Sequence, residues 1–153
     1  MRVLDRSERK ALLEELEKAF GLEELPQDLV LLEGSEGKVR ASTREAYEMA
    51  QRIGRVESLG LYVLKRTKFG TYLSVEGSQL LGERLKKNVV ELTAEQLERW
   101  ASGEPLDLSE LGFKPDGNFV VVRYGPVFAG SGKVSRDGKV HPQIPKERRV
   151  PVE

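Results

Sequence analysis

The chain has 153 residues, a formal net charge of zero and no cysteine. Charged residues make up 33% with both signs mixed along the chain, which is typical of a globular protein and not of a disordered tail. The missing cysteines exclude disulfides, thiolate catalysis and zinc ribbons. No apolar run approaches the roughly 20 residues that span a bilayer. The first ten residues are polar and lack the apolar core of a signal peptide, so we expect a cytoplasmic protein.

The neutral total hides an uneven distribution of charge. Residues 1–36 hold five Lys/Arg and ten Asp/Glu, a net of −5, whereas residues 118–150 hold seven Lys/Arg and two Asp/Glu, a net of +5. A basic end of this kind indicates a surface that faces a polyanion. The alternative is that mixed surface charge merely keeps the protein dissolved, and composition alone favours that alternative.

The first third of the chain predicts a helix followed by two strands. Leu12, Leu16 and Phe20 fall on one helical face, Ser7 is the expected cap, and Gly21 stands where a left-handed stop is needed. The apolar run 28–32 predicts a buried strand, and a Gly-Ser-Glu-Gly turn leads to a partner strand at 38–41.

A second helix is predicted from Ser42, which with Glu45 forms a capping box. Gly54 is expected to end this helix. The apolar residues at helical spacing form its expected buried stripe, and they are Ala46, Met49, Ala50 and Ile53. Strands are predicted at 57–65 and 70–74. Ser74 then caps a short helix that runs through Leu81.

The third long helix carries the clearest local signals. Thr93 and Gln96 form a capping box, and Leu92 with Leu97 supplies a hydrophobic staple. Trp100 lies on the same face as Leu97, and we expect it to anchor the core, because large aromatic side chains are usually packed.

After Pro105 the pattern changes to strands. We predict strands at 119–124, 127–134 and 139–144, with a tight Asp-Gly hairpin at 137–138 and a last edge strand at 148–152. Glycines at 130 and 132 inside a strand indicate a bend or the close approach of another group. The expected fold is α+β, with a mixed α/β domain at 1–76 and a small β pseudo-barrel with one or two short helices at 77–153.

Candidate catalytic groups are few. There is one histidine, His141, and no Asp/Glu cluster with calcium-loop spacing. Gly130-Ser-Gly-Lys133 superficially resembles a phosphate-binding loop, but Val127 replaces its first glycine and Val134 its Ser/Thr. We therefore expect no catalytic residue, metal or cofactor, and no enzyme activity.

The positive signal is a set of cations in the second half of the chain. Folded as one β-domain, they would form a surface that binds RNA phosphates, with Tyr124 or His141 available for stacking. The alternative is a scatter of solvated side chains. The predicted RNA-binding residues are Lys86, Lys87, Arg123, Lys133, Arg136, Lys139, Lys146, Arg148 and Arg149.

Two stretches of the second half resemble PUA domains. Residues 117–134 read GNFVVVRYGPVFAGSGKV, a turn, an apolar strand and a strand rich in small residues, and this is similar to the PUA signature. Residues 137–149 (DGKVHPQIPKERR) look like the PUA regions of Sun-type RNA cytosine methyltransferases, as does the helix region from 89 to 103.

Residues 56–66 (VESLGLYVLKR) and 73–82 (LSVEGSQLLG) resemble the pre-PUA domain of Nip-type ribosome-biogenesis factors. This resemblance implies a targeting module for structured RNA, in which the basic C-terminal part, here Lys146, Arg148 and Arg149, contacts RNA. The methyltransferase relatives carry their catalytic cysteines in a separate domain. The implied partners are rRNA or tRNA and an RNA methyltransferase or ribosome-assembly factor.

The leading hypothesis is thus a non-catalytic protein that binds structured rRNA or tRNA in ribosome biogenesis or RNA modification. The acidic first helix favours an alternative, a protein-interaction module that docks an RNA-modifying enzyme or assembly factor without contacting RNA. A small RNA-modifying enzyme is a third and weaker hypothesis.

Overall fold

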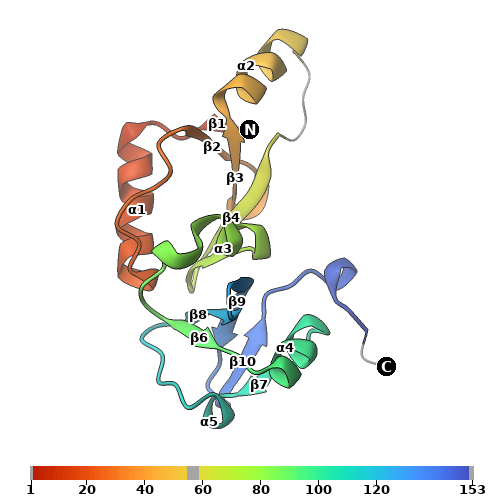
Figure 1. The fold of residues 1–153 in the computed structure, drawn as a ribbon. Helices are drawn as coiled ribbons and strands as arrows, with labels where there is room; N and C mark the ends of the chain where they lie inside the picture. Colours follow the sequence, from red (N-terminus) through yellow and green to blue (C-terminus); the bar gives the residue numbers. More distant parts are fainter. Residues whose placement is uncertain (1, 55–58, 152–153) are drawn as a thin grey trace.

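Two five-stranded sheets, one after the other along the chain, form the protein (Figure 1). The computed structural model describes residues 2–54 and 59–151. No helix among these residues is long and apolar enough to cross a membrane. The mixture of helices with two separate sheets confirms the predicted α+β class.

The first sheet is antiparallel, with its strands in sequence order β1-β2-β3-β4-β5. Strands β2 and β3 confirm the predicted pair, and a 3₁₀ turn, η1, joins them. Residues 57 and 58 of the predicted strand 57–65 lie outside the described residues, and β4 begins at Leu61. The bounds are β1 (Arg2–Val3), β2 (Leu29–Glu33), η1 (Ser35–Gly37), β3 (Lys38–Thr43), β4 (Leu61–Thr67) and β5 (Gly70–Leu73).

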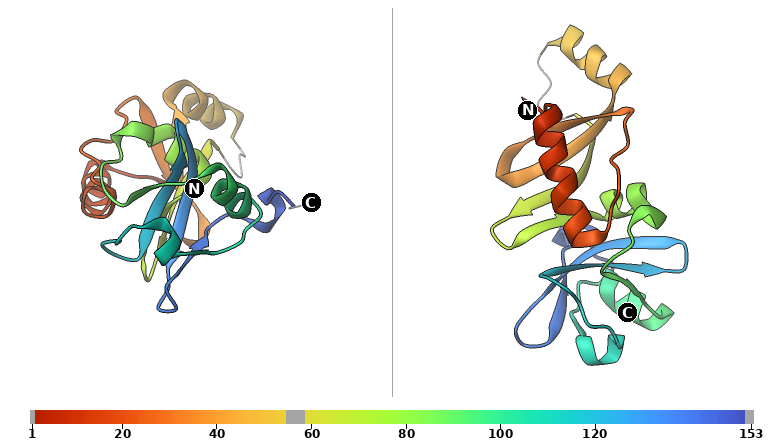
Figure 2. Two further views of the ribbon diagram at one scale, coloured as in Figure 1. Left: turned by 60° about the horizontal axis from the view of Figure 1, so that its bottom comes forward. Right: turned by 90° about the vertical axis from the view of Figure 1, so that its left-hand side faces the viewer.

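Helix α1 (Arg6–Phe20) lies across one face of this sheet (Figure 2, right). The predicted cap at Ser7 is wrong, because Asp5 and Glu8 form the capping box. An Asp5 carboxylate oxygen accepts from the Glu8 N–H at 2.8 Å, and the Glu8 carboxylate accepts from the Asp5 N–H at 3.1 Å. Gly21 ends the helix with a φ of 68°, as predicted.

Helix α2 (Arg44–Ile53) projects beyond the first sheet (Figure 1). Its cap is Thr43 and not Ser42, because Ser42 is buried in β3. The predicted buried stripe is also wrong. No residue of α2 is buried, and Met49 and Ile53 are 54% and 69% exposed. The amphipathic pattern is present, but within the described chain its apolar side is left largely uncovered, with only Ala50 half-buried.

The second sheet has the order β6-β8-β9-β10-β7, in which β6 and β8 are parallel and the other pairs antiparallel. The helix predicted after Ser74 is confirmed as α3, which links the two sheets. The bounds are α3 (Val75–Leu81), η2 (Gly82–Arg84), β6 (Val89–Glu91), α4 (Ala94–Ala101), β7 (Leu106–Asp107), α5 (Leu108–Leu111), β8 (Phe119–Tyr124), β9 (Val127–Val134), β10 (Lys139–Pro142) and η3 (Lys146–Arg148).

Helix α4 packs on the second sheet through Trp100, which is fully buried as predicted. Its indole N–H donates to the Ala129 carbonyl at 2.9 Å. A Cβ on Gly132 would lie 2.5 Å from the indole and 2.3 Å from Val140, so the absence of a side chain at Gly132 is what admits Trp100. The capping box of Thr93 and Gln96 is also confirmed.

One face of the second sheet shares a hydrophobic core with the first sheet, whereas a second buried cluster, which includes Trp100, Val120 and Val122, belongs to the second sheet alone. A single cluster joins Leu12 and Leu73 of the first part to Phe119 and Val121 of β8. Two buried hydroxyls bind the second sheet to the first sheet and to the linker helix α3, respectively. The Leu73 N–H donates to Ser131 Oγ at 2.9 Å, and the Gly130 N–H donates to Ser78 Oγ at 3.0 Å. The predicted domain division at residues 76 and 77 falls inside α3, and it stays a prediction.

The segment after β10 differs from the sequence expectation. An edge strand was predicted at 148–152, but the described part of this segment contains the 3₁₀ turn η3 and no strand. Its backbone makes one bond to α4, in which the Val150 N–H donates to the Ala101 carbonyl at 2.7 Å. This bond ties the C-terminal segment to the second sheet's helix and leaves η3 facing the first sheet.

Candidate nucleic-acid interface

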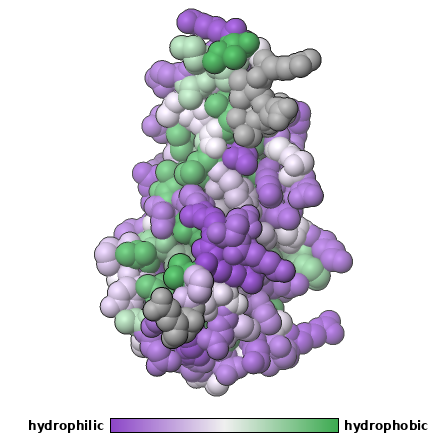
Figure 3. All heavy atoms as spheres, turned by 90° about the vertical axis from the view of Figure 1, so that its right-hand side faces the viewer, coloured by the Kyte–Doolittle hydropathy of each residue, from purple (hydrophilic) through white to green (hydrophobic). Residues whose placement is uncertain are grey.

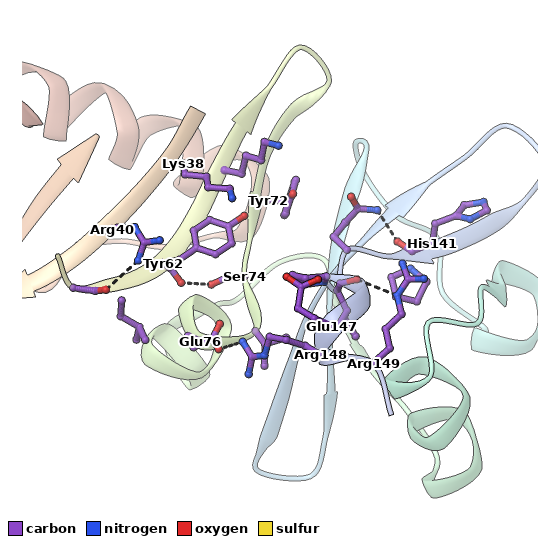
Figure 4. A pocket seen from close by; sticks show the side chains of 18 residues that line it. Lys38, Arg40, Tyr62, Tyr72, Ser74, Glu76, His141, Glu147, Arg148 and Arg149 are labelled. Atoms are coloured by element: carbon purple, nitrogen blue, oxygen red, sulfur yellow. Dashed lines mark hydrogen bonds and ion pairs between the residues drawn. The ribbon is translucent and has the colours of Figure 1, made fainter. Parts of the chain in front are cut away.

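A cleft of about 750 Å³ lies between the first sheet and the C-terminal segment (Figure 4). One wall is formed by β3, β4 and β5, and the other by the end of β10 and residues 143–149. On the face that carries the C-terminal segment, strongly hydrophilic side chains gather at mid-height (Figure 3). The cleft therefore brings together parts of the chain that are far apart in sequence.

Strand alternation places the cations of the first wall. Val39 is fully buried, so Lys38 and Arg40 on either side of it point away from the core and toward the cleft. Lys65, the register partner of Tyr72, lines the same wall. The Arg40 guanidinium donates to the Gly60 carbonyl at 3.2 Å, which fixes its position.

Two tyrosines add aromatic surface to this wall. Tyr62 and Tyr72 lie side by side in the cleft (Figure 4), and the Lys38 ammonium is 5.4 Å from the centre of the Tyr62 ring. Burial raises the pKa of Tyr62 above its ordinary value, and the neighbouring Tyr72 hydroxyl raises it further. Both effects keep the Tyr62 phenol neutral, so it places no negative charge in the cleft.

The second wall is held in place by bonds of its own. Arg148 forms an ion pair with Glu76 at the start of α3, which joins the C-terminal segment to the linker between the sheets. The Arg149 Nε donates to the Ile144 carbonyl at 3.1 Å. The stem of Arg149 lies against Gly103, where an added Cβ would be 2.5 Å away.

The cleft carries a surplus of positive charge. Five cations and two carboxylates line it, a difference of three positive charges. Walls lined by one sign of charge raise the local concentration of an oppositely charged ligand. The cations are Lys38, Arg40, Lys65, Arg148 and Arg149, and the carboxylates are Glu76 and Glu147.

Of the nine predicted RNA-binding residues, Arg148 and Arg149 line the cleft. Three others form ion pairs with carboxylates elsewhere on the protein. The Lys87 ammonium is 2.8 Å from the Asp116 carboxylate, and the Arg123 guanidinium is 2.6 Å from the Glu83 carboxylate. Lys139 is 3.9 Å from Asp107. These three cations are partly neutralised by their partners.

The remaining four predicted residues form no ion pair with the part of the chain that the structure describes: Lys86, Lys133, Arg136 and Lys146. They are not gathered at one place, because Lys86 lines a hollow with Glu23 and Glu24, whereas the Lys133 ammonium lies over the Phe69 ring. The structure thus divides the predicted set between several places.

The predicted stacking residues are also separated. Tyr124 is 42% exposed at the tip of the β8–β9 hairpin, whereas His141 lines the cleft. The His141 Nε2 is 3.2 Å from the Ser135 hydroxyl. Sequence reasoning missed Lys38, Arg40, Lys65 and both cleft tyrosines, although the alternation of Lys38 and Arg40 around Val39 is a visible signal of an exposed strand face.

The described residues contain no group of three or more His, Asp or Glu side chains that could hold a metal ion. The groups that line the cleft are ammonium and guanidinium groups, phenol hydroxyls and ring faces. Such groups bind phosphates and stack on bases.

Two comparisons with known proteins show a similarity to PUA domains. Residues 87–150 match the family model described as the methyltransferase RsmF PUA domain. A crystal structure of a PUA domain from Aeropyrum pernix K1, solved as a tartrate complex, is similar in fold, with a TM-score of 0.55 and 19% identity. The similarity covers 92% of this chain and 73% of that one. No curated protein sequence matches.

Proposed function

The chain is a PUA-domain protein whose second sheet resembles the PUA regions of Sun-type RNA methyltransferases, and we propose that it binds structured RNA in the cleft between its first sheet and its C-terminal segment. PUA domains are non-catalytic and generally bind RNA. The observation that carries the proposal is the cleft's surplus of three positive charges beside two tyrosines. Phosphate contacts supply most of the affinity in such complexes.

The finer role follows from the sequence resemblance. The RNA is an rRNA or a tRNA, and the protein acts in ribosome biogenesis or RNA modification as a cytoplasmic adaptor without catalysis of its own. An RNA methyltransferase or ribosome-assembly factor is the expected partner. The resemblance to pre-PUA and PUA arrangements supports this role.

The experiment is an RNA titration across a salt series. A fluorescein-labelled RNA hairpin with a single-stranded tail is titrated with the protein, and anisotropy gives Kd at each salt concentration. The test variant replaces Lys38, Lys65 and Arg148 by alanine. Removing one cation that binds a phosphate flattens the log–log salt slope by roughly 0.7–0.9, so the expected flattening is about 2–3.

A matched control removes three cations elsewhere. Arg6, Lys10 and Lys114 are exposed and do not line the cleft. The triple alanine variant at these positions has the same net charge as the test variant. Equal slopes for the two variants, or no RNA affinity of the wild type at low salt, would refute the proposal.

A second candidate function is protein docking, and the uncovered apolar side of α2 favours it. Hydrophobic side chains are visible at the outer end of this helix (Figure 3). A Met49→Glu/Ile53→Glu variant separates the two functions. If docking is the function, this variant loses a nuclease-resistant partner, and the wild type has no RNA affinity of its own.

A further inference from the structure

Helix α2 lacks the packing that normally stabilises a helix of its length. It has 10 residues, and helices shorter than about 12–15 residues are marginal in water unless tertiary contacts cover their apolar face. None of its residues is buried, and it projects beyond the first sheet (Figure 1). Tyr47 and Ala50 are half-buried, and the other residues of the helix are exposed. A surface that covers its apolar side would therefore stabilise it.

The uncovered surface is an apolar stripe that continues to the edge of the first sheet. Ala46, Met49 and Ile53 follow helical spacing and are exposed, and hydrophobic side chains are visible at the outer end of the helix (Figure 3). At its base, Val3 of the edge strand β1 is 38% exposed and, with Ala50, lines a hollow of about 230 Å³. The stripe and this hollow together form one apolar surface.

The charges beside the stripe are complementary to themselves. Glu45 and Arg52 are seven residues apart, which is nearly two helical turns, so they lie on the same flank of the stripe near its two ends. In an antiparallel pair of identical helices, the same flank of each copy faces the other. Glu45 of one copy then lies beside Arg52 of the other, and the two-fold symmetry forms this ion pair twice.

The apolar side chains are complementary in size in the same arrangement. When the pair is centred between Met49 and Ala50, Ile53 of one copy faces Ala46 of the other, and Met49 faces Ala50. Large side chains opposite small ones are what allow two helices to interdigitate. A parallel pair would place Ile53 against Ile53 and Glu45 far from Arg52. Charge and size therefore both favour an antiparallel pair.

We propose that α2 is the interface of a homodimer in which the two copies of this helix pack antiparallel. The proposal is independent of RNA binding, because no residue of α2 lines the cleft and the dimer carries two clefts. Two helices of 10 residues bury less than the roughly 1,000 Å² of a stable interface. The dimer is therefore weak and dissociates at the low micromolar concentrations of a urea titration.

The first test is sedimentation equilibrium from micromolar to millimolar protein. The wild type forms a reversible dimer. Glu45→Arg and Arg52→Glu each place like charges opposite one another, so each variant alone is monomeric. An equimolar mixture of the two variants dimerises again, because each chain supplies the charge that the other needs. Arg44→Glu is the matched control, since it changes the net charge as Arg52→Glu does but lies on the helix face away from the stripe.

A second test reads the register of the pair. The chain has no cysteine, so Ala46→Cys and Ile53→Cys each introduce a single thiol. Positions 46 and 53 of different copies face each other, whereas two copies of the same position are about 10 Å apart along the helix axis. A disulfide does not form when the Cα atoms are more than about 7 Å apart. Oxidation should therefore link the two variants to each other in a mixture and leave each variant alone largely unlinked.

Three outcomes would overturn the homodimer. One is a wild type that stays monomeric at millimolar concentration. Another is self-association of Glu45→Arg and Arg52→Glu as strong as that of the wild type, which would place the contact on a different surface. The third is a monomeric wild type whose nuclease-resistant partner is lost in the Met49→Glu/Ile53→Glu variant, which would assign α2 to a different protein.

Discussion

Replacing Ser131 by alanine tests whether the two sheets fold as one unit. Ser131 is fully buried in β9, and its hydroxyl accepts the Leu73 N–H at 2.9 Å. Alanine leaves that N–H without a partner, and Leu73 itself is fully buried. An unsatisfied buried donor costs about 1–3 kcal/mol, so the free energy of unfolding should fall by that amount.

The assay is urea denaturation followed by two probes. Trp100 fluorescence reports the second sheet, in which the indole is buried, and far-UV circular dichroism reports the whole chain. Because one core cluster includes residues of both sheets, the two probes should give the same midpoint, and Ser131→Ala should lower both equally. Ser35→Ala, at an exposed position in η1, is the control and should change stability by less than about 0.5 kcal/mol.

Two results would refute this reasoning. One is a Ser131→Ala variant as stable as the control, which would mean that the Leu73 N–H is satisfied in another way. The other is a pair of separate transitions, which would mean that the sheets are independent domains despite the shared core. The second result would favour the domain division that the sequence predicts at residues 76 and 77.

Three further predictions concern the fold. Gly132→Ala should destabilise the protein by about 1–3 kcal/mol in urea titrations, because the added Cβ overlaps the ring of Trp100. The pKa of the Glu8 carboxyl is lowered to about 2, chiefly by its hydrogen bond with Arg2, so its contribution to stability is present above about pH 4.5 and is lost toward pH 2. The stability gap between wild type and Glu8→Gln in urea should shrink over that range. Met49→Gln should change the free energy of unfolding, measured in urea, by less than about 0.5 kcal/mol, because the Met49 side chain is 54% exposed and both residues favour helix. A loss of more than about 2 kcal/mol would show that α2 is packed.

Features set by neighbouring residues could be predicted from the sequence. The caps at Ser74 and Thr93 follow from hydrogen bonds between residues three apart, and the stop at Gly21 from the backbone freedom of glycine. The burial of Trp100 follows from its size and its position on the apolar face of α4. A local prediction can still be wrong where two neighbouring residues can both cap a helix, since Asp5 caps α1 in place of the predicted Ser7.

Features set by distant residues could not be predicted. The apolar spacing of α2 indicates a helix with an apolar side, but spacing carries no information about what covers that side, and Ile53 is exposed. The cleft could not be predicted for the same reason, because distant parts of the chain form it. Lys38 belongs to the third strand and Arg148 to the C-terminal segment, and only the packing of the two sheets brings them to one cavity. Charge counts found the basic end of the chain and missed the cations of β3 and β4 that face it.

The most direct test of RNA binding in the cleft is an NMR titration of ¹⁵N-labelled protein with the tailed RNA hairpin. We predict that the amide signals that shift most belong to both walls of the cleft, represented by Tyr62, Lys65 and Arg148. Shifts confined to the surface around Arg136 and α5, with the cleft signals unmoved, would contradict RNA binding at this site.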